Sequence, residues 1–333
     1  MELRVQDIGE QGLLKRVQAF CPSTFASELG EALSVGDDAA VLPTEPGKSL
    51  VVTSDVLVDG VHFSDSTTPP ESAGWRAAAA NLSDLAAMGA SPLGITVGLG
   101  LPGDVLVSWV ERLYVGMTDC LRRYNTVIVG GDICRSPVIT VSITALGQVD
   151  PTRVIRRSTA QPGDAIVVTG YHGSSRAGLE LLLHPEVEPE LEGRASLIHA
   201  HQYPNPRLDV LPPFPCAGMD SSDGVADAVL QLCQASGVGA RLDRQRIPIH
   251  PALRNWASPE QAMQWALYGG EDFELVLCLP KESAQELVKQ SGEGSAIVGT
   301  ITSNPEVRVV DSTGEYSDQI LTLEEGFQHF KSE

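Results

Sequence analysis

The order of apolar patterns between residues 49 and 149 most restricts what this chain can fold into. Strand-like and helix-like segments follow one another as strand, helix, strand, helix, strand and strand. The strands are expected at 49–55, 93–101, 126–132 and 138–149, and the helices at 69–89 and 104–124. This order predicts a mixed sheet with two helices on one face, preceded by an amphipathic helix at 12–20.

The second half of the chain has a similar rhythm. Residues 151–163 end in the turn-forming sequence AQPGD and indicate a domain boundary. Strands are expected at 165–170, 273–280, 295–302 and 306–311, and helices at 174–183, 223–237 and 281–290, with the helix at 223–237 capped by its preceding acidic residues. The sequence therefore predicts an α/β (α+β) protein with an N-terminal domain at 1–150 and a C-terminal α/β domain at 151–333.

Composition excludes several classes of function. The 333 residues suffice for two domains, and 23 basic against 43 acidic side chains give a net charge of −20, which argues against nucleic-acid and membrane partners. Six cysteines form no CxxC pair, and Cys233 and Cys278 sit in apolar runs, as small core residues do. With no apolar signal core and no membrane-length apolar run, we expect a soluble, cytoplasmic protein.

Acidic clusters recur after apolar runs along the whole chain. They are VGDDAA (Asp37, Asp38), VTSD (Asp55), NLSD (Asp84), VGGD (Asp132), MDSSDG (Asp220, Asp223) and YGGED (Glu271, Asp272). A single aspartate of this kind is usually a helix N-cap, but Asp84 falls inside a predicted helix. Convergent carboxylates would repel by about 4 kcal/mol per pair at ~4 Å and an effective dielectric of ~20. Such a cluster needs cations, and oxygen ligands without His or Cys favour Mg²⁺ or Ca²⁺.

Other motifs give weaker signals. GLGLPG matches GxGxxG, but position 119, where a ribose-binding acid would fall, lies within the next predicted helix. GKS at 47–49 precedes its strand and has Leu42 in place of the first Walker glycine, while His199 and His201 lack a third metal ligand. A calcium-binding structural protein would concentrate its ligands in one loop. Scattered ligands instead suggest an active site in which substrate phosphates complete the metal shell.

The motifs, taken in order, resemble a known family. GDDAAVL, TSDVLVDGVHF, NLSDLAAMGA, VGGD, RSTAQPGD, SSDG and GGEDFEL are similar to the thiamine-monophosphate kinases of the aminoimidazole ribonucleotide synthetase-like ATP-binding superfamily, from Asp37 to Phe327. VDGVHF favours the kinases over selenophosphate synthetases, which carry an N-terminal reactive Cys or selenocysteine, and over the hydrogenase-maturation relative, which ends in a functional Cys. The resemblance implies that superfamily's two-domain fold and a homodimer.

The resemblance also implies the site residues. Magnesium ligands are expected at Asp38, Thr53, Ser54, Asp55, Asp84, Asp132, Asp220 and Asp223. Contacts with ATP are expected from Tyr114, Gly131, Asp132, Arg157 and Ser222. Contacts with thiamine monophosphate are expected from His62, Glu271 and Phe327.

The implied reaction is the ATP-dependent phosphorylation of thiamine monophosphate to thiamine diphosphate, the final step in making that cofactor. A phosphate monoester has a second pKa near ~6, so the acceptor is largely a dianion at neutral pH and needs no protein base. We therefore expect direct in-line transfer assisted by several Mg²⁺ ions, with no protein nucleophile. Two alternatives stay open: another enzyme of the superfamily that forms an acyl- or imidate-phosphate, and a non-catalytic metal-binding protein.

Overall fold

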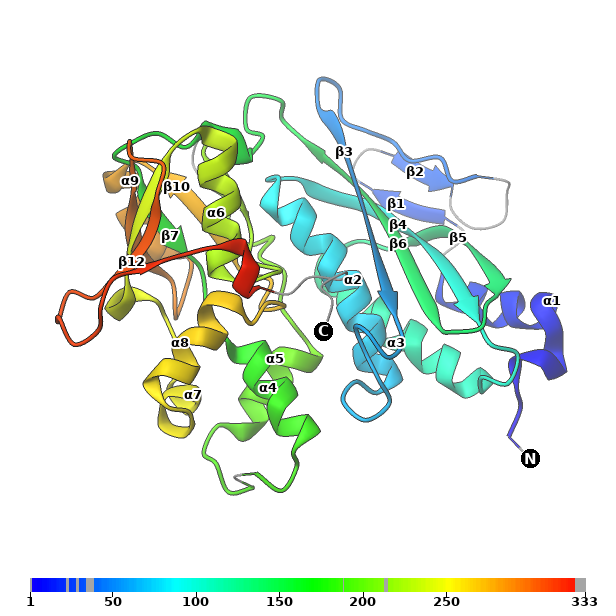
Figure 1. Cartoon of the computed structure of the whole chain (residues 1–333). Coiled ribbons are helices and arrows are strands. Elements are labelled where there is room, and N and C mark those ends of the chain that lie inside the picture. The colour runs from blue at the N-terminus through cyan, green and yellow to red at the C-terminus, as the bar shows by residue number, and fades with distance from the viewer. Residues whose placement is uncertain are drawn as a thin grey trace. The chain divides into compact units, whose positions relative to one another are not determined.

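The structure, a computed structural model, describes residues 2–21, 24–27, 30–33, 39–187, 189–212 and 215–326 (Figure 1). It divides into two compact units. Unit 1 comprises Met1–Leu85 and Ala90–Pro151, and unit 2 comprises Ala86–Gly89 and Thr152–Glu333. Among the described residues, no helix combines the length and the apolar content that crossing a membrane requires.

Unit 1 is built on a four-stranded mixed sheet. Its elements are α1 (Val5–Val17), η1 (Gln18–Phe20), β1 (Thr24–Ser27), β2 (Gly30–Leu33), β3 (Ser49–Val58), α2 (Pro70–Ala87), β4 (Ser91–Leu101), α3 (Val107–Arg123), β5 (Ile128–Arg135) and β6 (Thr140–Val149). The strand order is β3-β6-β4-β5, with β4 and β5 parallel and the other pairs antiparallel. β1 and β2 form a separate antiparallel pair.

The two faces of this sheet differ in burial. Along β4, Ile95, Val97 and Leu99 are buried on one face, and α2 and α3 lie together on one side of the sheet (Figure 1). Along β3, Val52 and Val56 are about half exposed on the other face, called here the open face. Strand alternation explains this division, because successive side chains point to opposite faces. The prediction of a mixed sheet with helices on one face is confirmed.

One sequence interpretation of unit 1 needs correction. β3 does not end near Asp55; it pairs with β6 as far as Val58, because the alternating pattern continues through the buried Leu57. By contrast, the structure agrees with the sequence argument against a dinucleotide-binding turn at GLGLPG. Gly98 and Gly100 lie within β4, which continues to Leu101 and pairs on both sides.

Unit 2 is built on a seven-stranded sheet of order β13-β12-β9-β11-β7-β10-β8. Its strands are β7 (Ala165–Val168), β8 (Ala217–Asp220), β9 (Gly239–Asp243), β10 (Leu275–Leu279), β11 (Ala296–Thr302), β12 (Val307–Val310) and β13 (Gln319–Ile320). Its helices are η2 (Arg157–Thr159), α4 (Ser174–Leu183), α5 (Arg194–Gln202), α6 (Val225–Ser236), η3 (Arg244–Arg246), α7 (Pro251–Trp256), α8 (Pro259–Tyr268), α9 (Lys281–Gln290) and η4 (Leu323–Glu325). Neighbouring strands of this sheet are antiparallel except β9 and β12, which are parallel.

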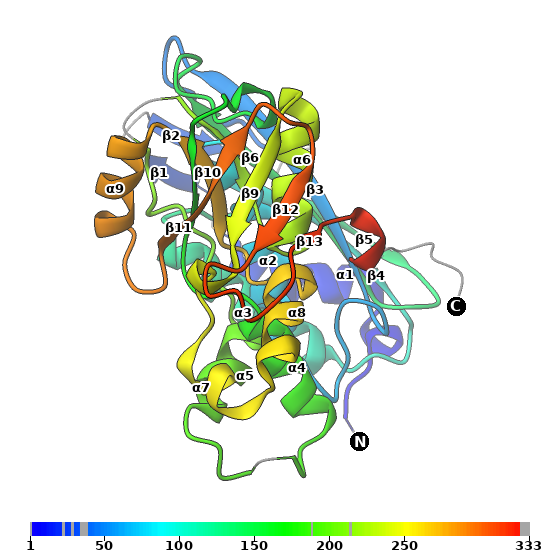
Figure 2. The same cartoon turned by 60° about the vertical axis from the view of Figure 1, so that its left-hand side comes forward.

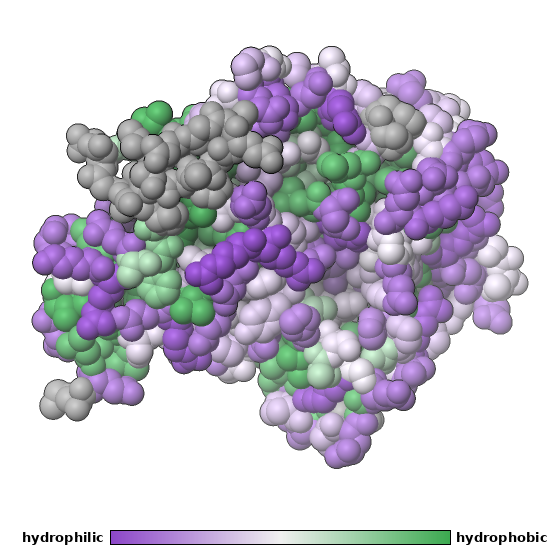
Figure 3. All heavy atoms as spheres, turned by 180° about the vertical axis from the view of Figure 1, so that it is seen from behind, coloured by the Kyte–Doolittle hydropathy of each residue, from purple (hydrophilic) through white to green (hydrophobic). Residues whose placement is uncertain are grey.

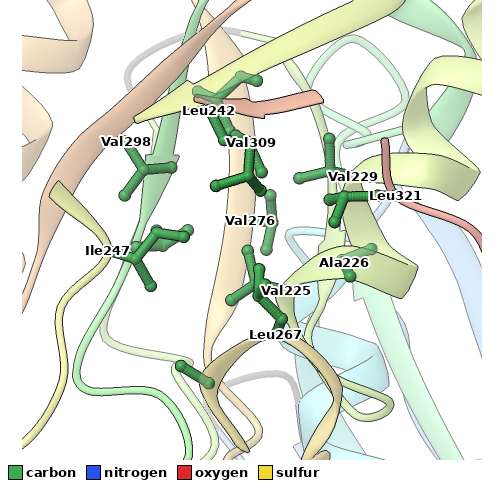
Figure 4. Close-up of a cluster of buried hydrophobic side chains, with 14 of the residues drawn as sticks. Val225, Ala226, Val229, Leu242, Ile247, Leu267, Val276, Val298, Val309 and Leu321 are labelled. Carbon is green, nitrogen blue, oxygen red and sulfur yellow. The ribbon is translucent and has the colours of Figure 1, made fainter. Parts of the chain in front are cut away.

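The unit 2 sheet is buried on both faces. Alternate residues of β10 enter two separate cores: Val276 packs in one with Val229 of α6, and Leu277 packs in the other with Leu287 of α9. Figure 2 shows α6 and α9 on opposite sides of the sheet, and Figure 4 shows Val276 among the side chains of the first core. Burial on both faces accounts for the continuous apolar run LVLCL.

Two short strands of unit 2 could not be predicted from the sequence. β8 and β9 were not predicted, because each is short and carries polar or acidic residues. The prediction of a side-chain cap on α6 is wrong: its N-cap residue is Gly224, which has no side chain to accept a hydrogen bond. Cys233 and Cys278 are buried, as predicted. Hydrophilic side chains predominate on the face of the molecule in Figure 3.

Candidate active site

Acidic and hydroxyl side chains cluster on unit 1 where α2 lies against β3. Thr53 Oγ1 donates a hydrogen bond to the Asp84 carboxylate. One turn earlier on α2, Asn81 Oδ1 accepts a hydrogen bond of 3.2 Å from the backbone nitrogen of Asp55. Asp84 lies inside α2, so the prediction that it is no helix cap is confirmed. The structure thus brings Thr53 into contact with Asp84, and Asn81, which sequence analysis missed, fixes the backbone of the nearby Asp55.

Ser54 belongs to the open face instead. Its hydroxyl donates to the Ile143 carbonyl at 2.9 Å and accepts from Thr144 Oγ1 at 3.3 Å. Since neighbouring strand residues point to opposite faces, its side chain points away from those of Thr53 and Asp55. Ser54 is exposed at the edge of the sheet.

Asp132 lies at the opposite edge of the same sheet. Its register partners across the sheet are Gly98 on β4, Ser142 on β6 and Val56 on β3. Three inter-strand spacings separate it from β3, or ~14 Å at about 4.8 Å each. Asp132 is exposed on the open face, so one copy of unit 1 does not bring it to Asp84. A Cβ on the preceding residue, Gly131, would lie 2.1 Å from the Val97 carbonyl oxygen, so only glycine fits at this position.

The turn after β3 fixes His62. Its Nδ1 accepts a hydrogen bond of 3.1 Å from the backbone nitrogen of Val58, and its own backbone nitrogen donates to the Val58 carbonyl at 2.9 Å. The following Phe63 is buried, with its ring centroid 6.3 Å from that of Trp109. The VDGVHF turn is therefore anchored to α3.

Tyr114 is a core residue of α3. Only 3% of its surface is exposed, and its ring centroid lies 5.8 Å from that of Phe20. Burial raises the pKa of its phenol. Tyr114 therefore has a packing role, and within unit 1 its side chain does not lie on a surface that a nucleotide could reach.

In unit 2, two loops with site candidates are joined through their backbones. The Ser222 hydroxyl lies 3.5 Å from Asp220 Oδ1, and the Ser222 carbonyl accepts a hydrogen bond of 2.6 Å from the backbone nitrogen of Glu271. Asp220 is buried at the end of β8, whereas Asp223 is exposed. The SSDG and GGED sequences therefore occupy one loop cluster.

Arg157 lies beside α6. Its Nη1 donates to Gln231 Oε1 at 2.5 Å, and Gln231 in turn donates to Asp227 at 2.6 Å. Burial is the main cause that raises the pKa of Asp227. Arg157 is exposed, so its guanidinium can reach a ligand.

Asp272 has a role that sequence analysis did not assign. Its carboxylate accepts hydrogen bonds from the backbone nitrogens of Gly173 at 2.6 Å and Ser175 at 2.8 Å, at the start of α4. Burial raises the pKa of Asp272 to about 7, while these two amides favour the ionised form. The local sequence gave no signal for this cap, because its donors lie about a hundred residues away along the chain.

Comparison with known proteins places the chain in a family. Residues 36–149 match the AIR synthase related protein N-terminal domain, and residues 161–312 match the C-terminal domain of the same family. The thiamine-monophosphate kinase of Synechococcus elongatus is 51% identical over 98% of this chain and 98% of that protein. The chain belongs to the thiamine-monophosphate kinase family. The resemblance inferred from the motifs is thereby confirmed.

Solved structures of thiamine-monophosphate kinases share the fold. That from Stenotrophomonas maltophilia K279a aligns with a TM-score of 0.77 at 30% identity, covering 93% of this chain and 97% of that one. AaThiL complexed with AMPPCP and TMP aligns with a TM-score of 0.73 at 32% identity, covering 96% of this chain and 98% of that one. The expected two-domain fold is confirmed, and as a thiamine-monophosphate kinase family member the chain is an enzyme.

The oxygen donors of unit 1 suit a hard divalent cation. Thr53 and Asp84 place a hydroxyl and a carboxylate oxygen in contact, next to Asp55, and neither His nor Cys takes part. Within the ranges that the structure describes, no three His, Cys, Asp or Glu side chains form a metal-binding group. Asp38 and Phe327, a metal and a substrate candidate, lie outside the described residues.

Proposed function

We propose that this chain phosphorylates thiamine monophosphate to thiamine diphosphate with ATP, the final step in making that cofactor. The 51% identity with a thiamine-monophosphate kinase over nearly the whole of both chains carries this proposal. AaThiL, whose fold this chain shares, was solved with TMP and with AMPPCP, an ATP analogue that cannot transfer its terminal phosphoryl group. Under this proposal the acceptor is a phosphate group.

Several carboxylates would hold the magnesium ions. Thr53, Asp55 and Asp84 are the candidates that unit 1 brings together. Ser54 and Asp132 on the open face, Asp38, and Asp220 and Asp223 of unit 2 complete the proposed ligand set. When bound, Mg²⁺ neutralises phosphate charge, so that two polyanions can approach each other. ATP and Mg²⁺ binding is assigned to the N-terminal domain, and completion of the phosphate and substrate contacts to the C-terminal domain.

Direct transfer needs no protein base. The acceptor phosphate is already largely dianionic at neutral pH and is its own nucleophile. The task of the protein is to align donor and acceptor and to exclude competing water. Exposed Arg157 would contact ATP together with Gly131, Asp132 and Ser222. Tyr114, the other residue expected at this site, is buried and would support it through packing within unit 1. His62, Glu271 and Phe327 would contact thiamine monophosphate.

The position of Asp132 supports a homodimer. β3 and β5 are the two edge strands of the unit 1 sheet, and each pairs with a single neighbour among the described residues. Edge strands present unpaired backbone groups that a second copy can cover. If β5 of one copy meets β3 of another, Asp132 reaches the Ser54–Asp55 region of its partner.

The six cysteines, all free, are consistent with the cytoplasm as the compartment.

An acceptor panel tests this function. The protein is mixed with ATP and Mg²⁺, and release of ADP is measured with thiamine monophosphate, thiamine, pyridoxal phosphate and ribose 5-phosphate in turn. We expect turnover with thiamine monophosphate alone. Comparable turnover with unrelated monoesters or with carboxylate and amide acceptors would favour another enzyme of the superfamily. No turnover with any acceptor would favour a non-catalytic metal-binding protein.

A further inference from the structure

The loop Gly269–Glu274, called here the GGED loop, has an unusual backbone. It joins α8 to β10, and its non-glycine residues Glu271 and Phe273 have φ angles of 59° and 52°. L-residues rarely adopt this left-handed region, because their Cβ atoms crowd the backbone. Two such residues flanking Asp272 require surroundings that hold them in place.

Asp272 provides the first anchor of this loop. Its two carboxylate oxygens separately accept hydrogen bonds from Gly173 and Ser175, whose amides open α4. The N-cap residue of α4 is Gly173, which cannot cap the helix itself. Asp272 therefore serves α4 as a cap from a remote segment, and the positive end of the helix favours its negative charge.

Glu274 provides the second anchor. Its Oε2 accepts hydrogen bonds from Thr169 Oγ1 at 2.5 Å and from Arg207 Nη1 at 2.7 Å. Arg207 is buried and also binds both carboxylate oxygens of Asp209 at 2.9 Å. A Cβ at Gly170 would lie 2.0 Å from Glu274 Oε1, so the chain leaves room for this carboxylate with a glycine.

The backbone of the GGED loop is also tied to the neighbouring loop that contains Ser221 and Ser222. Glu271 donates its amide hydrogen to the Ser222 carbonyl, and Ser221 donates to the Glu274 carbonyl at 2.7 Å. The GGED loop is thus fixed at Asp272 and Glu274, with Glu271 immediately before the first anchor.

We propose that Asp272 is a positioning residue for Glu271. By capping α4 it holds Glu271 in the left-handed conformation, ready to contact the organic part of the acceptor, and it does not touch substrate itself. This inference rests on the proposed function, in which Glu271 binds thiamine monophosphate.

The substitution Asp272→Asn tests the inference. Asparagine has one acceptor oxygen, so it can serve only one of the two α4 amides and turns an NH₂ group toward the other. We expect the KM for thiamine monophosphate to rise about tenfold, with kcat and the KM for ATP changed less than about twofold. Hydrogen exchange at the Glu271 and Ser175 amides should accelerate. A variant with unchanged KM for thiamine monophosphate and unchanged exchange would overturn the proposal.

Asp311→Asn is the matched control. Asp311 accepts hydrogen bonds from the backbone nitrogens of Thr313, Glu315 and Tyr316 in a turn after β12, five strands from β8 across the unit 2 sheet. The substitution Asp311→Asn therefore removes the same kind of carboxylate–amide hydrogen bond, from the same unit, as Asp272→Asn does. The KM for thiamine monophosphate should not change in this variant; a tenfold rise there would mean that general loosening, and not positioning, explains the effect.

A double-mutant cycle separates this inference from the proposed function. If Asp272 acts through Glu271, Asp272→Asn should add little to the KM of a Glu271→Gln variant. Additive effects would overturn the positioning role while leaving the substrate role of Glu271 intact. An unchanged KM in Glu271→Gln alone would overturn the substrate role, and with it this inference.

One measurement needs no variant, in case Asp272→Asn does not fold. Thiamine monophosphate added to the wild-type protein should slow hydrogen exchange at Glu271 and at Ser175, and leave the Asp311 turn unaffected. Unchanged exchange at both amides, under conditions where thiamine monophosphate is shown to bind by calorimetry, would overturn the proposal.

Discussion

At the scale of single residues, the surroundings of Asp84 suit the metal-ligand role that the proposed function gives it. Its hydrogen-bond donor Thr53 is a neutral hydroxyl, which orients the carboxylate without cancelling its charge. Asp55 follows two residues later on the same face of β3. Under the proposed function, a bound cation would offset the mutual repulsion of these carboxylates, which lowers the stability of the metal-free protein.

We predict that Asp84→Asn lowers kcat by at least about a hundredfold, because a metal ligand loses its charge. In the absence of Mg²⁺ its free energy of unfolding should equal that of the wild type or exceed it by up to about 1 kcal/mol, since repulsion is relieved. Activity assays and urea denaturation measure the two effects. Asp119→Asn, which alters an exposed carboxylate paired with Arg122 on α3, is the control and should change neither. Full activity, or unfolding of the metal-free variant, would refute the metal-ligand role.

His172 gives the molecule an acid-sensitive position. It is fully buried between β7 and α4, and burial lowers its pKa to about 4, against an ordinary value of 6.5. Below pH 6.5 His172 binds a proton in the unfolded chain but stays neutral in the folded chain. The free energy of unfolding therefore decreases as the pH falls from 6.5 toward 4. At pH 5 the loss is about 2 kcal/mol.

The substitution His172→Phe checks this pH dependence. The wild type should lose about 2 kcal/mol more unfolding free energy than the variant between pH 8 and pH 5, because phenylalanine binds no proton. Denaturant unfolding at several pH values gives both curves. Parallel curves for the two proteins would show that His172 does not titrate as its burial requires.

Residue roles differed in how far the sequence could predict them. That Asp84 is no cap followed from its place in an Ala-rich helical pattern, which depends only on neighbouring residues. The partner of Asp272 could not be found in this way, because a cap supplied by a distant segment exists only after tertiary packing. Asn81 escaped for the same reason: its acceptor role depends on β3 lying beside α2.

At the scale of elements, α2 and α3 cross unusually closely. A Cβ at Gly74 would lie 1.9 Å from the Leu113 carbonyl oxygen, and one at Gly116 would lie 1.7 Å from that of Glu71. Glu71 also binds Arg112 through both carboxylate oxygens, at 2.5 and 2.8 Å. Glycines at the crossing allow backbone to approach backbone, and this contact supports the helix that carries Asp84.

We predict that Gly116→Ala lowers the free energy of unfolding by about 3 kcal/mol or more. The added methyl group meets backbone, which no side-chain rotation can relieve. Gly98→Ala is the control, since its Cβ would sit at an ordinary 3.6 Å from Ser142 and should cost less than about 1 kcal/mol. Urea denaturation compares them; equal losses would mean that the helices separate without cost.

Element positions were largely predictable, whereas their assembly was not. α4 and α9 coincide with the predicted 174–183 and 281–290, because their periodic patterns and boundaries are local. The seven-stranded order of unit 2 could not be predicted, since no strand records its neighbour in its own residues. β8 was not predicted, because it is only four residues long and ends in one of the acidic motifs.

At the scale of the whole molecule, the separation of Asp132 from β3 makes a prediction about assembly. If Asp132 serves a partner copy, Asp84→Asn and Asp132→Asn proteins are each inactive, but mixing and reassociating them should restore about a quarter of wild-type activity. Half of the dimers are then mixed, and each has one intact site and one doubly altered site. Assays after mixing, with each variant alone as the control, measure this recovery. No recovery despite proven exchange of subunits would place Asp132 in the site of its own chain.

The most direct test of the proposed reaction follows the transferred phosphoryl group. The protein is incubated with Mg²⁺, thiamine monophosphate and ATP labelled with ¹⁸O in its γ-phosphate, and the products are analysed by mass spectrometry. We predict thiamine diphosphate whose terminal phosphate carries the label, in amounts equal to the ADP formed, and no labelled protein. ADP formed without labelled thiamine diphosphate, or a labelled phosphoenzyme, would contradict direct transfer between the two substrates.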